Sequence, residues 1–191
     1  FVYIIKVRGA VIMSLRSTIR NRVSTKKYTT EWVNPDKIIS LLDTAVYAPN
    51  HKMREPWRFI IIEGEGKDKL VNNYVNMFKE SEREDQRKLL SKVMEAPAIV
   101  SIIMKKSPVL ADEVEDLQAC AALIQNFLLL LEEERMASHW KTPKYIESEK
   151  FKDALGIQNN EVIVALIMVG YSLAKTEPKT RQSAKSLTTI Y

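Results

Sequence analysis

The feature that most limits how this 191-residue chain can fold is the segment 116–133, whose pattern predicts a long helix. Its middle, from Ala119 to Leu131, is apolar on nearly every side, with Gln125 and Asn126 as the polar exceptions. Such a helix must be covered all round, because apolar surface is unfavourable in water. The pattern therefore predicts that it lies at the centre of the fold or against a second subunit.

Three further apolar segments have the length and composition of buried strands, at 57–63, 98–104 and 161–169. Helices are predicted between them and before them, over 14–22, from 35 to a point before Pro49, over 70–78, 80–92 and 148–155. Gly64 and Gly66 predict a turn, and Met136 to Thr142 a loop. Because helices and strands intermingle without a linker, we expect one domain of the α+β or α/β class.

The composition limits the kinds of ligand that the chain is expected to bind and the cellular compartment in which it is expected to lie. The net charge of +5 is modest and its basic residues are interspersed with acidic ones, so nucleic-acid binding is not indicated, while a small phosphorylated ligand would fit. Cys120 is the only cysteine, so no intrachain disulfide can form and the reducing cytoplasm is the expected location.

The amino-terminal segment 1–12 is apolar but is interrupted by Lys6 and Arg8, which is not typical of a signal peptide. Met13 looks more like a natural start, so we expect residues 1–12 to be an extension and 13–191 the single domain. No uninterrupted apolar run reaches the ~18–20 residues of a membrane span.

A cationic, hydroxyl-rich segment follows the first predicted helix, Arg22-Val23-Ser24-Thr25-Lys26. An arginine fork fits two phosphate oxygens, serine and backbone amides add neutral donors, and lysine can place a compact charge beside an electron-rich ring. One interpretation is a site for a phosphorylated ligand. The other is a solvated helix end.

Two prolines bracket a second polar segment, Ala48-Pro49-Asn50-His51-Lys52-Met53-Arg54-Glu55-Pro56, which runs directly into a strand. Asn50 and His51 offer hydrogen bonds, and Met53 offers a soft apolar contact for a flat aromatic ligand. Loops that end at a rigid sheet often carry function. The alternative interpretation is a simple connector.

A third segment, His139-Trp140-Lys141-Thr142, follows the long helix, and could equally be a surface turn that Trp140 anchors in the core. His51 and His139 lack a third ligand at metal-site spacing, so no metal is expected. We find no nucleophile–base arrangement, no Walker loop and no dinucleotide-binding glycine motif.

Together the three segments resemble the FMN-dependent nitroreductases, most closely the small single-domain NAD(P)H nitroreductase branch, from about Ser14 to the carboxyl terminus. The first segment resembles the motif that holds the FMN phosphate and ribityl chain. The second resembles a loop that reaches the FMN bound mainly by the other subunit. The third resembles a segment that contacts the isoalloxazine ring through backbone groups. The resemblance implies these FMN-binding residues: Arg22, Val23, Ser24, Lys26, Pro49, Asn50, His51, Met53, Trp140, Lys141, Thr142 and Arg181, with Lys179 as the alternative to Arg181.

This resemblance also implies an α+β sandwich around a mixed, mainly antiparallel sheet, assembled as an intertwined homodimer in which Leu187–Tyr191 adds to the other subunit's sheet. The implied activity is transfer of hydride from NADH or NADPH through FMN to electron-poor acceptors such as nitroaromatics or quinones. Lys26 is expected to stabilise negative charge on the N1/O2 side of reduced flavin, and no protein side chain is expected to act as a catalyst.

Two positions depart from the family pattern. Val23 replaces a common polar residue, and Glu55 stands where glutamine is usual, so no role is assigned to Glu55. Two alternatives stay open: another redox reaction on the same flavin fold, or a basic binding module without redox activity. The physiological acceptor and the choice between NADH and NADPH are also open.

Overall fold

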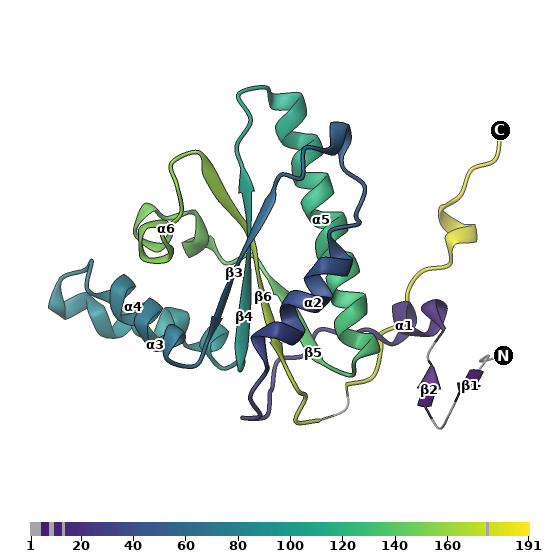
Figure 1. Ribbon diagram of the computed structural model, residues 1–191, viewed down its shortest axis with the longest axis horizontal. Coiled ribbons are helices and arrows are strands. Elements are labelled where there is room, and N and C mark those ends of the chain that lie inside the picture. Colours follow the sequence, from purple (N-terminus) through teal and green to yellow (C-terminus); the bar gives the residue numbers. More distant parts are fainter. Residues whose placement is uncertain (1–4, 8–9, 13, 175) are drawn as a thin grey trace.

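The computed structural model describes residues 5–7, 10–12, 14–174 and 176–191. Among these residues, a central sheet has the strand order β3-β4-β6-β5, and every pair of neighbours is antiparallel (Figure 1). Its strands are β3 (Trp57–Glu63), β4 (Ala98–Lys105), β5 (Ala137–Lys141) and β6 (Glu161–Gly170). The three predicted buried strands are therefore confirmed, and the sheet gains β5 at one edge.

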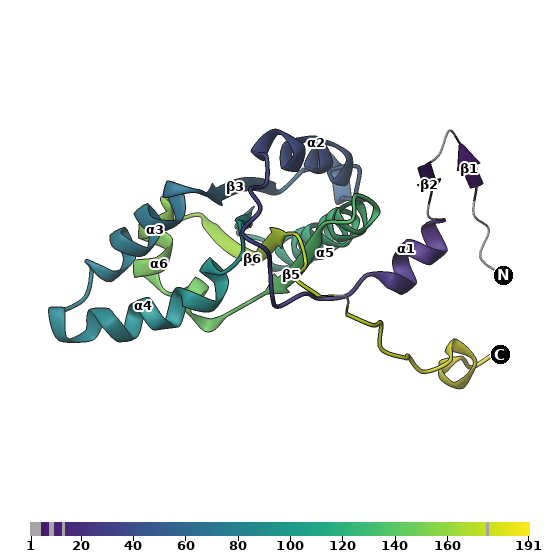
Figure 2. The same cartoon turned by 90° about the horizontal axis from the view of Figure 1, so that it is seen from below.

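Helices cover both faces of the sheet (Figures 1 and 2). One face carries α3 (Glu65–Val75), α4 (Glu80–Met94) and α6 (Glu149–Leu155), and the other carries α2 (Pro35–Ala45) and α5 (Leu110–Glu133). Alternation along β4 divides the core, since Ile99 packs with the first set and Val100 with the second. The expected α+β sandwich is confirmed.

Helices α1 and α2 begin within a residue of their predicted starts, whereas α3 begins at Glu65 and α5 at Leu110, five and six residues before the predicted 70 and 116. Asn34 Oδ1 accepts a hydrogen bond of 2.9 Å from the Asp36 N–H, and Pro35 occupies the first turn of α2. Ser14 caps α1 (Leu15–Asn21) through a 3.2 Å bond from the Ser17 N–H. These local contacts satisfy backbone donors that would otherwise lack an intrahelical partner.

Three sequence expectations need correction. Gly66 does not form a turn, because it lies inside α3, which begins just after Gly64. Residues 137–141 are not a loop, because they pair with β6 as strand β5. The parallel component of the expected mixed sheet is limited, among the described residues, to an isolated bridge between Ser24 and Ser138.

Within one chain, the apolar middle of α5 is covered on nearly every side, and from Ala119 to Leu131 only Gln125 is exposed. Leu123, Ile124, Phe127 and Leu131 are fully buried, and the half-exposed Leu117 (49%) lies before this stretch. The cover expected for Ala119–Leu131 is therefore largely provided by the single chain. By length and composition alone α5 could cross a membrane, but it packs on the sheet as a core helix does.

Two terminal arms extend from one side of the sandwich (Figure 2). The amino-terminal arm holds α1 and a small hairpin of β1 (Ile5–Val7) and β2 (Ala10–Ile12). The carboxyl-terminal arm ends in a 3-10 turn, η3 (Ala184–Leu187), and Leu187–Tyr191 forms no strand within this chain. The predicted start at Met13 and part of the predicted extension 1–12 lie outside the described residues.

Two glycines offer a matched test of local backbone energetics. Gly156 ends α6 with φ of +69°, a conformation that strains other residues, whereas Gly66 lies inside α3 with open space around it. We expect Gly156→Ala to lower the free energy of unfolding by about 1 kcal/mol, and Gly66→Ala to raise it by about 0.5–1 kcal/mol. Urea unfolding monitored by circular dichroism measures both. Equal effects of the two substitutions would contradict this account.

Candidate functional site

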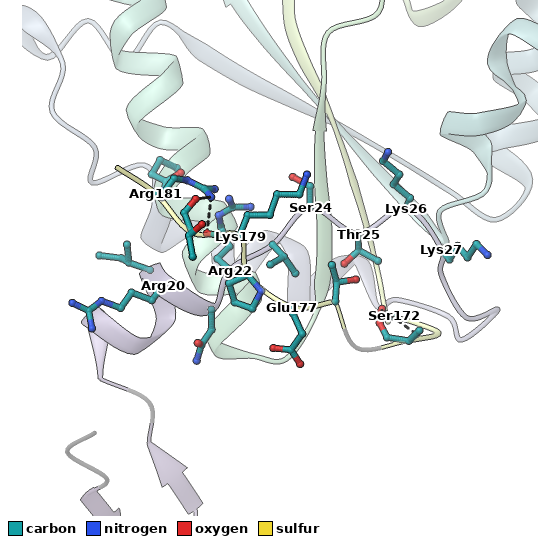
Figure 3. Close-up of a pocket in the computed structure, with 18 residues that line it drawn as sticks. Arg20, Arg22, Ser24, Thr25, Lys26, Lys27, Ser172, Glu177, Lys179 and Arg181 are labelled. Atoms are coloured by element: carbon teal, nitrogen blue, oxygen red, sulfur yellow. Dashed lines mark hydrogen bonds between the residues drawn. The ribbon is translucent and has the colours of Figure 1, made fainter. Parts of the chain in front are cut away.

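A hollow of about 1250 Å³ lies where the two terminal arms leave the sandwich (Figure 3). It is lined by the end of α1, by the segment 22–27, by Ser172, Ala174 and residues 176–181 of the carboxyl-terminal arm, and by Gln125 of α5. Six of the predicted residues gather here, although they are up to 159 positions apart in the chain: Arg22, Val23, Ser24, Lys26, Lys179 and Arg181. We call this hollow the arm pocket.

Backbone pairing to the sheet edge holds the segment 22–27 in place. Ser24 forms a parallel bridge with Ser138 of β5, in which the Thr25 N–H donates to the Ser138 carbonyl at 2.9 Å. The Tyr28 hydroxyl donates to the Thr25 carbonyl at 3.0 Å. The first and third predicted motifs therefore lie side by side within one chain.

The carboxyl-terminal wall of the arm pocket is tied to the same segment. The Thr29 N–H donates to the Tyr171 carbonyl at 2.8 Å, and the Leu173 N–H donates to the Lys27 carbonyl at 3.2 Å. Gly170 permits this close approach, since a Cβ there would lie 2.8 Å from Tyr28 Cδ1 and 2.6 Å from Pro97 Cδ.

Cationic groups dominate the end of the arm pocket nearest α1. Arg22, Lys179 and Arg181 lie together there, and Arg181 donates to the backbone carbonyls of Lys179 and Thr180 at 2.7 and 3.2 Å (Figure 3). Arg22 is half-buried. Burial raises the pKa of Glu132, and the nearby Arg22 charge opposes that rise, which places a carboxylate close to this arginine. This cluster is suited to a multiply charged anion.

The second predicted motif forms a strained loop. Its 3-10 turn η1 (His51–Met53) and the residues after it contain three non-glycine residues with positive φ, Lys52 (53°), Met53 (50°) and Glu55 (44°). Such conformations persist only where surrounding contacts enforce them, and they cluster at functional sites. The Asn50 side chain is one such contact, because its Oδ1 accepts from the Glu55 N–H at 3.0 Å.

Arg54 clamps this loop to α5. Its Nε donates to Asp116 Oδ1 at 2.7 Å and its Nη2 to Glu115 Oε2 at 2.9 Å, and Asp112 lies 3.4 Å from Nη1. The hydrogen bond from Arg54 lowers the pKa of Glu115. Pro49, His51 and Met53 remain exposed on the loop that this clamp holds, and Met53 is 73% exposed.

Within one chain, this loop does not reach the arm pocket. It contacts α5 at Asp116, whereas the pocket meets α5 at Gln125, about 14 Å further along at ~1.5 Å of rise per residue. Figure 1 shows the loop before β3 at one end of α5 and α1 towards the other. One chain therefore brings together the first and third motifs and the basic tail, but not the second motif.

The third motif lies on the edge strand β5 and just beyond it. Trp140 is half-buried and packs against the core beneath α2 and α5, which agrees with the anchoring role of the simpler interpretation. Lys141 ends β5, and Thr142 is exposed after it. His139 Nδ1 lies 3.1 Å from the Thr25 carbonyl, and burial, followed by the charge of Lys141, lowers its pKa.

The lowered pKa of His139 predicts a loss of stability in acid. The unfolded chain takes up this proton near pH 6.5, whereas the folded chain takes it up only at lower pH, so stability present above pH 6.5 is lost as the pH falls towards the folded pKa. We expect His139→Gln, which keeps a side-chain N–H donor for Thr25, to flatten the pH dependence of urea midpoints between pH 7 and 5. Parallel curves for the two proteins would contradict the lowered pKa.

Sequence reasoning missed the residues that assemble this region. Thr25, Tyr28 and Ser138 hold the first motif against β5, and Arg54 orients the second through carboxylates about 60 positions away. A basic residue in a loop and an acidic residue on a helix are common patterns, so no sequence signal pairs Arg54 with Asp116. A contiguous motif predicts which residues contact a ligand. The contacts that hold those residues in place join segments far apart in the chain, so the sequence does not predict them.

The sequence pattern of the nitroreductase family matches residues 19–171. The chain belongs to the nitroreductase family. This nitroreductase is 33% identical to YfhC of Bacillus subtilis (strain 168), a protein named provisionally as an NAD(P)H nitroreductase, over 172 residues that cover 87% of this chain and 89% of YfhC. Family membership places the chain among oxidoreductases.

Solved structures agree with the fold. A nitroreductase-like family protein from Bacillus cereus is 33% identical and superimposes with a TM-score of 0.86, covering 95% of this nitroreductase and 98% of that chain. A protein from Desulfovibrio desulfuricans, described provisionally as a nitroreductase and solved in complex with FMN, has 20% identity and a TM-score of 0.71, with coverage of 93% and 96%. At that lower identity the likeness concerns the fold alone.

Proposed function

We propose that this nitroreductase is an FMN-dependent NAD(P)H oxidoreductase that reduces electron-poor acceptors such as nitroaromatics or quinones. The observation that supports this most directly is the arm pocket, where the fold gathers the basic residues of the first motif and the carboxyl-terminal tail. The FMN complex of the Desulfovibrio relative and the NAD(P)H in the name of YfhC point the same way. A cytoplasmic location belongs to this proposal.

The donor set of the arm pocket fits a flavin mononucleotide. Arg22 and either Arg181 or Lys179 would hold the phosphate, because a doubly charged phosphate matches guanidinium and ammonium donors. Ser24 adds a neutral donor, and Lys26 lies further along the pocket, towards β5 (Figure 3). When bound, FMN supplies the two-electron chemistry by accepting hydride from the nicotinamide and passing it to the acceptor.

The remaining residues would position the flavin ring and exclude water. Trp140 and Lys141 lie on the edge strand that the Arg22–Lys27 segment borders, and Thr142 follows it; in this proposal they would approach the ring through backbone groups. Lys26 would stabilise negative charge on the reduced ring electrostatically. These assignments are part of the proposal.

The proposal also assigns the loop residues Pro49, Asn50, His51 and Met53 to the site of a second subunit. One chain holds this loop away from its own arm pocket, and α5 keeps half-exposed apolar residues such as Leu117. A homodimer in which the arms exchange would cover that surface and bring the loop of one chain to the pocket of the other. The exposed tail residues Leu187, Ile190 and Tyr191 would then pair with the partner's sheet.

A spectrum tests the proposed function directly. The purified protein should be yellow, should release FMN on denaturation, and should bleach when NADH or NADPH is added without oxygen. Reoxidation by a quinone or a nitroaromatic compound should restore the colour. A colourless protein that binds no added FMN would contradict the proposal and favour a binding module.

A further inference from the structure

A second cavity, of about 570 Å³, lies between α4 and the chain that follows β5. Its walls come from the carboxyl-terminal half of α4 on one side and from η2 (Lys144–Glu147) with the end of β5 on the other. Figure 2 shows α4 on the face of the sheet opposite α2 and α5. The volume is in the range of about 300–1000 Å³ that small ligands occupy. We call this hollow the lysine cavity.

The body of the lysine cavity is apolar. Leu89 and Val93 of α4 face Pro143 and Tyr145 across it. Leu89 is 48% exposed, which leaves apolar surface without cover in the single chain, and the Tyr145 ring is supported from behind by Phe151 at 4.9 Å between ring centroids. A flat hydrocarbon ring would cover this surface and gain free energy from its burial.

Three lysines also line the cavity: Lys92, Lys141 and Lys144. Within the part of the chain that the structure describes, none of the three ammonium groups forms an ion pair or a side-chain hydrogen bond. Like charges gathered around one hollow repel each other, and an anion between them removes that repulsion. The cavity therefore offers an apolar surface with an unneutralised cationic lining.

The lysine cavity and the arm pocket lie towards opposite ends of the same strand edge. Ser24 pairs with Ser138 near the start of β5, and Lys141 ends the strand about 10 Å further along at ~3.3 Å per residue. His139 lies between them, and Lys26 of the arm pocket and Lys141 of the lysine cavity both act electrostatically on it. A ligand extending along β5 from the arm pocket would end near Lys141.

We propose that the lysine cavity binds the carboxylate-bearing end of a flat aromatic acceptor and so selects aromatic acids among the substrates. This inference rests on the proposed function, because it places the acceptor beyond the flavin along β5. A carboxylate on an aromatic ring matches both parts of the cavity: the ring covers Leu89 and the half-buried Pro143, and the charge meets Lys92 and Lys144. No arginine lines the cavity, so it lacks the planar fork that favours phosphate.

Calorimetry with a non-reducible pair of ligands tests the cavity without turnover. The flavin-loaded protein should bind 2-naphthoate about three- to tenfold more tightly than 2-naphthamide, which has a similar shape but no charge. The double variant Lys92→Gln/Lys144→Gln should bring that ratio close to one. The matched control Lys69→Gln/Lys88→Gln removes two charges from α3 and α4 outside the cavity, and it should keep the wild-type ratio.

Turnover supplies the second measurement. The ratio of kcat/KM for 4-nitrobenzoate over 4-nitrobenzamide should fall by a similar factor in Lys92→Gln/Lys144→Gln and stay constant in the control. A naphthoate-to-naphthamide ratio near one in the wild type, or a ratio that survives the double substitution, overturns the proposal. It is also overturned if the double variant changes only the preference between NADPH and NADH, because the lysines then serve the electron donor.

The two proposals can fail separately. A protein that does not oxidise NAD(P)H but shows the lysine-dependent preference for naphthoate loses the proposed function and keeps the anion site. A protein that reduces quinones at full rate without that preference keeps the function and loses the anion site. Calorimetry and the anaerobic spectrum together distinguish these results.

Discussion

Arg22→Ala should purify as a paler protein and bind FMN about ten- to a hundredfold more weakly than the wild type. Arg22 is half-buried at the cationic end of the arm pocket, where we expect its guanidinium to form a charge-assisted pair with the phosphate. Removing such a pair costs about 1.5–3 kcal/mol. Fluorescence titration of the apoprotein with FMN measures the change, and high FMN concentration should restore the colour.

Arg16→Ala is the matched control, because Arg16 is exposed on α1 and does not line the arm pocket. It removes the same charge from the same arm, so a general electrostatic effect would weaken FMN binding in both variants. Equal FMN affinity in Arg22→Ala and the wild type would remove Arg22 from the site. A loss of affinity in Arg16→Ala as large as that in Arg22→Ala would point to a diffuse charge effect.

Mixing subunits should restore activity that each variant lacks alone. If every site draws the arm pocket from one chain and the loop at residues 49–53 from the other, a heterodimer of Arg22→Ala and His51→Ala has one doubly damaged site and one intact site. It should recover up to about half of the wild-type activity per dimer, as twofold interfaces allow. The separation of the loop from the arm pocket along α5 is the structural reason for this expectation.

The mixture must be shown to contain heterodimers, for example by differential tagging and native mass spectrometry. The two parent homodimers, treated in the same way, serve as controls for reassembly. Activity that stays at the parental level in a verified heterodimer would mean that one chain builds each site. It would also require the loop to move about 14 Å towards its own pocket, given ~1.5 Å of rise per residue along α5.

Local signals in the sequence predicted much of the scaffold correctly. Asn34 and Ser148 mark helix starts because their side chains cap backbone donors within three residues, and Gly156 marks a helix end because it adopts a left-handed conformation. The strand β4 was predictable for a different reason, since a buried central strand is apolar on both faces. In these cases the deciding interaction is local or depends on composition.

Where the sequence prediction failed, a distant partner decided the outcome. Residues 137–141 lack a strand-like pattern and become β5 only because β6 offers a free edge about 30 positions later. The same edge accepts Ser24, which is why the first motif lies next to the third. The α5 pattern could not show whether its cover comes from its own chain or from a second subunit; the sheet and α2 supply most of it, and only Gln125 is exposed between Ala119 and Leu131.

The candidate site shows the same division. The chain by itself determined which residue types could bind a phosphorylated ligand or a flat aromatic one, because the motifs around Arg22 and Asn50 are contiguous. Tertiary structure decided which of them meet: backbone pairing brings Arg22 to Arg181, and the Arg54 clamp holds Asn50 and His51 away from both. The physical reason is that each side chain's chemistry depends on its own residue type, whereas the distance between two site residues depends on contacts between segments far apart in the chain.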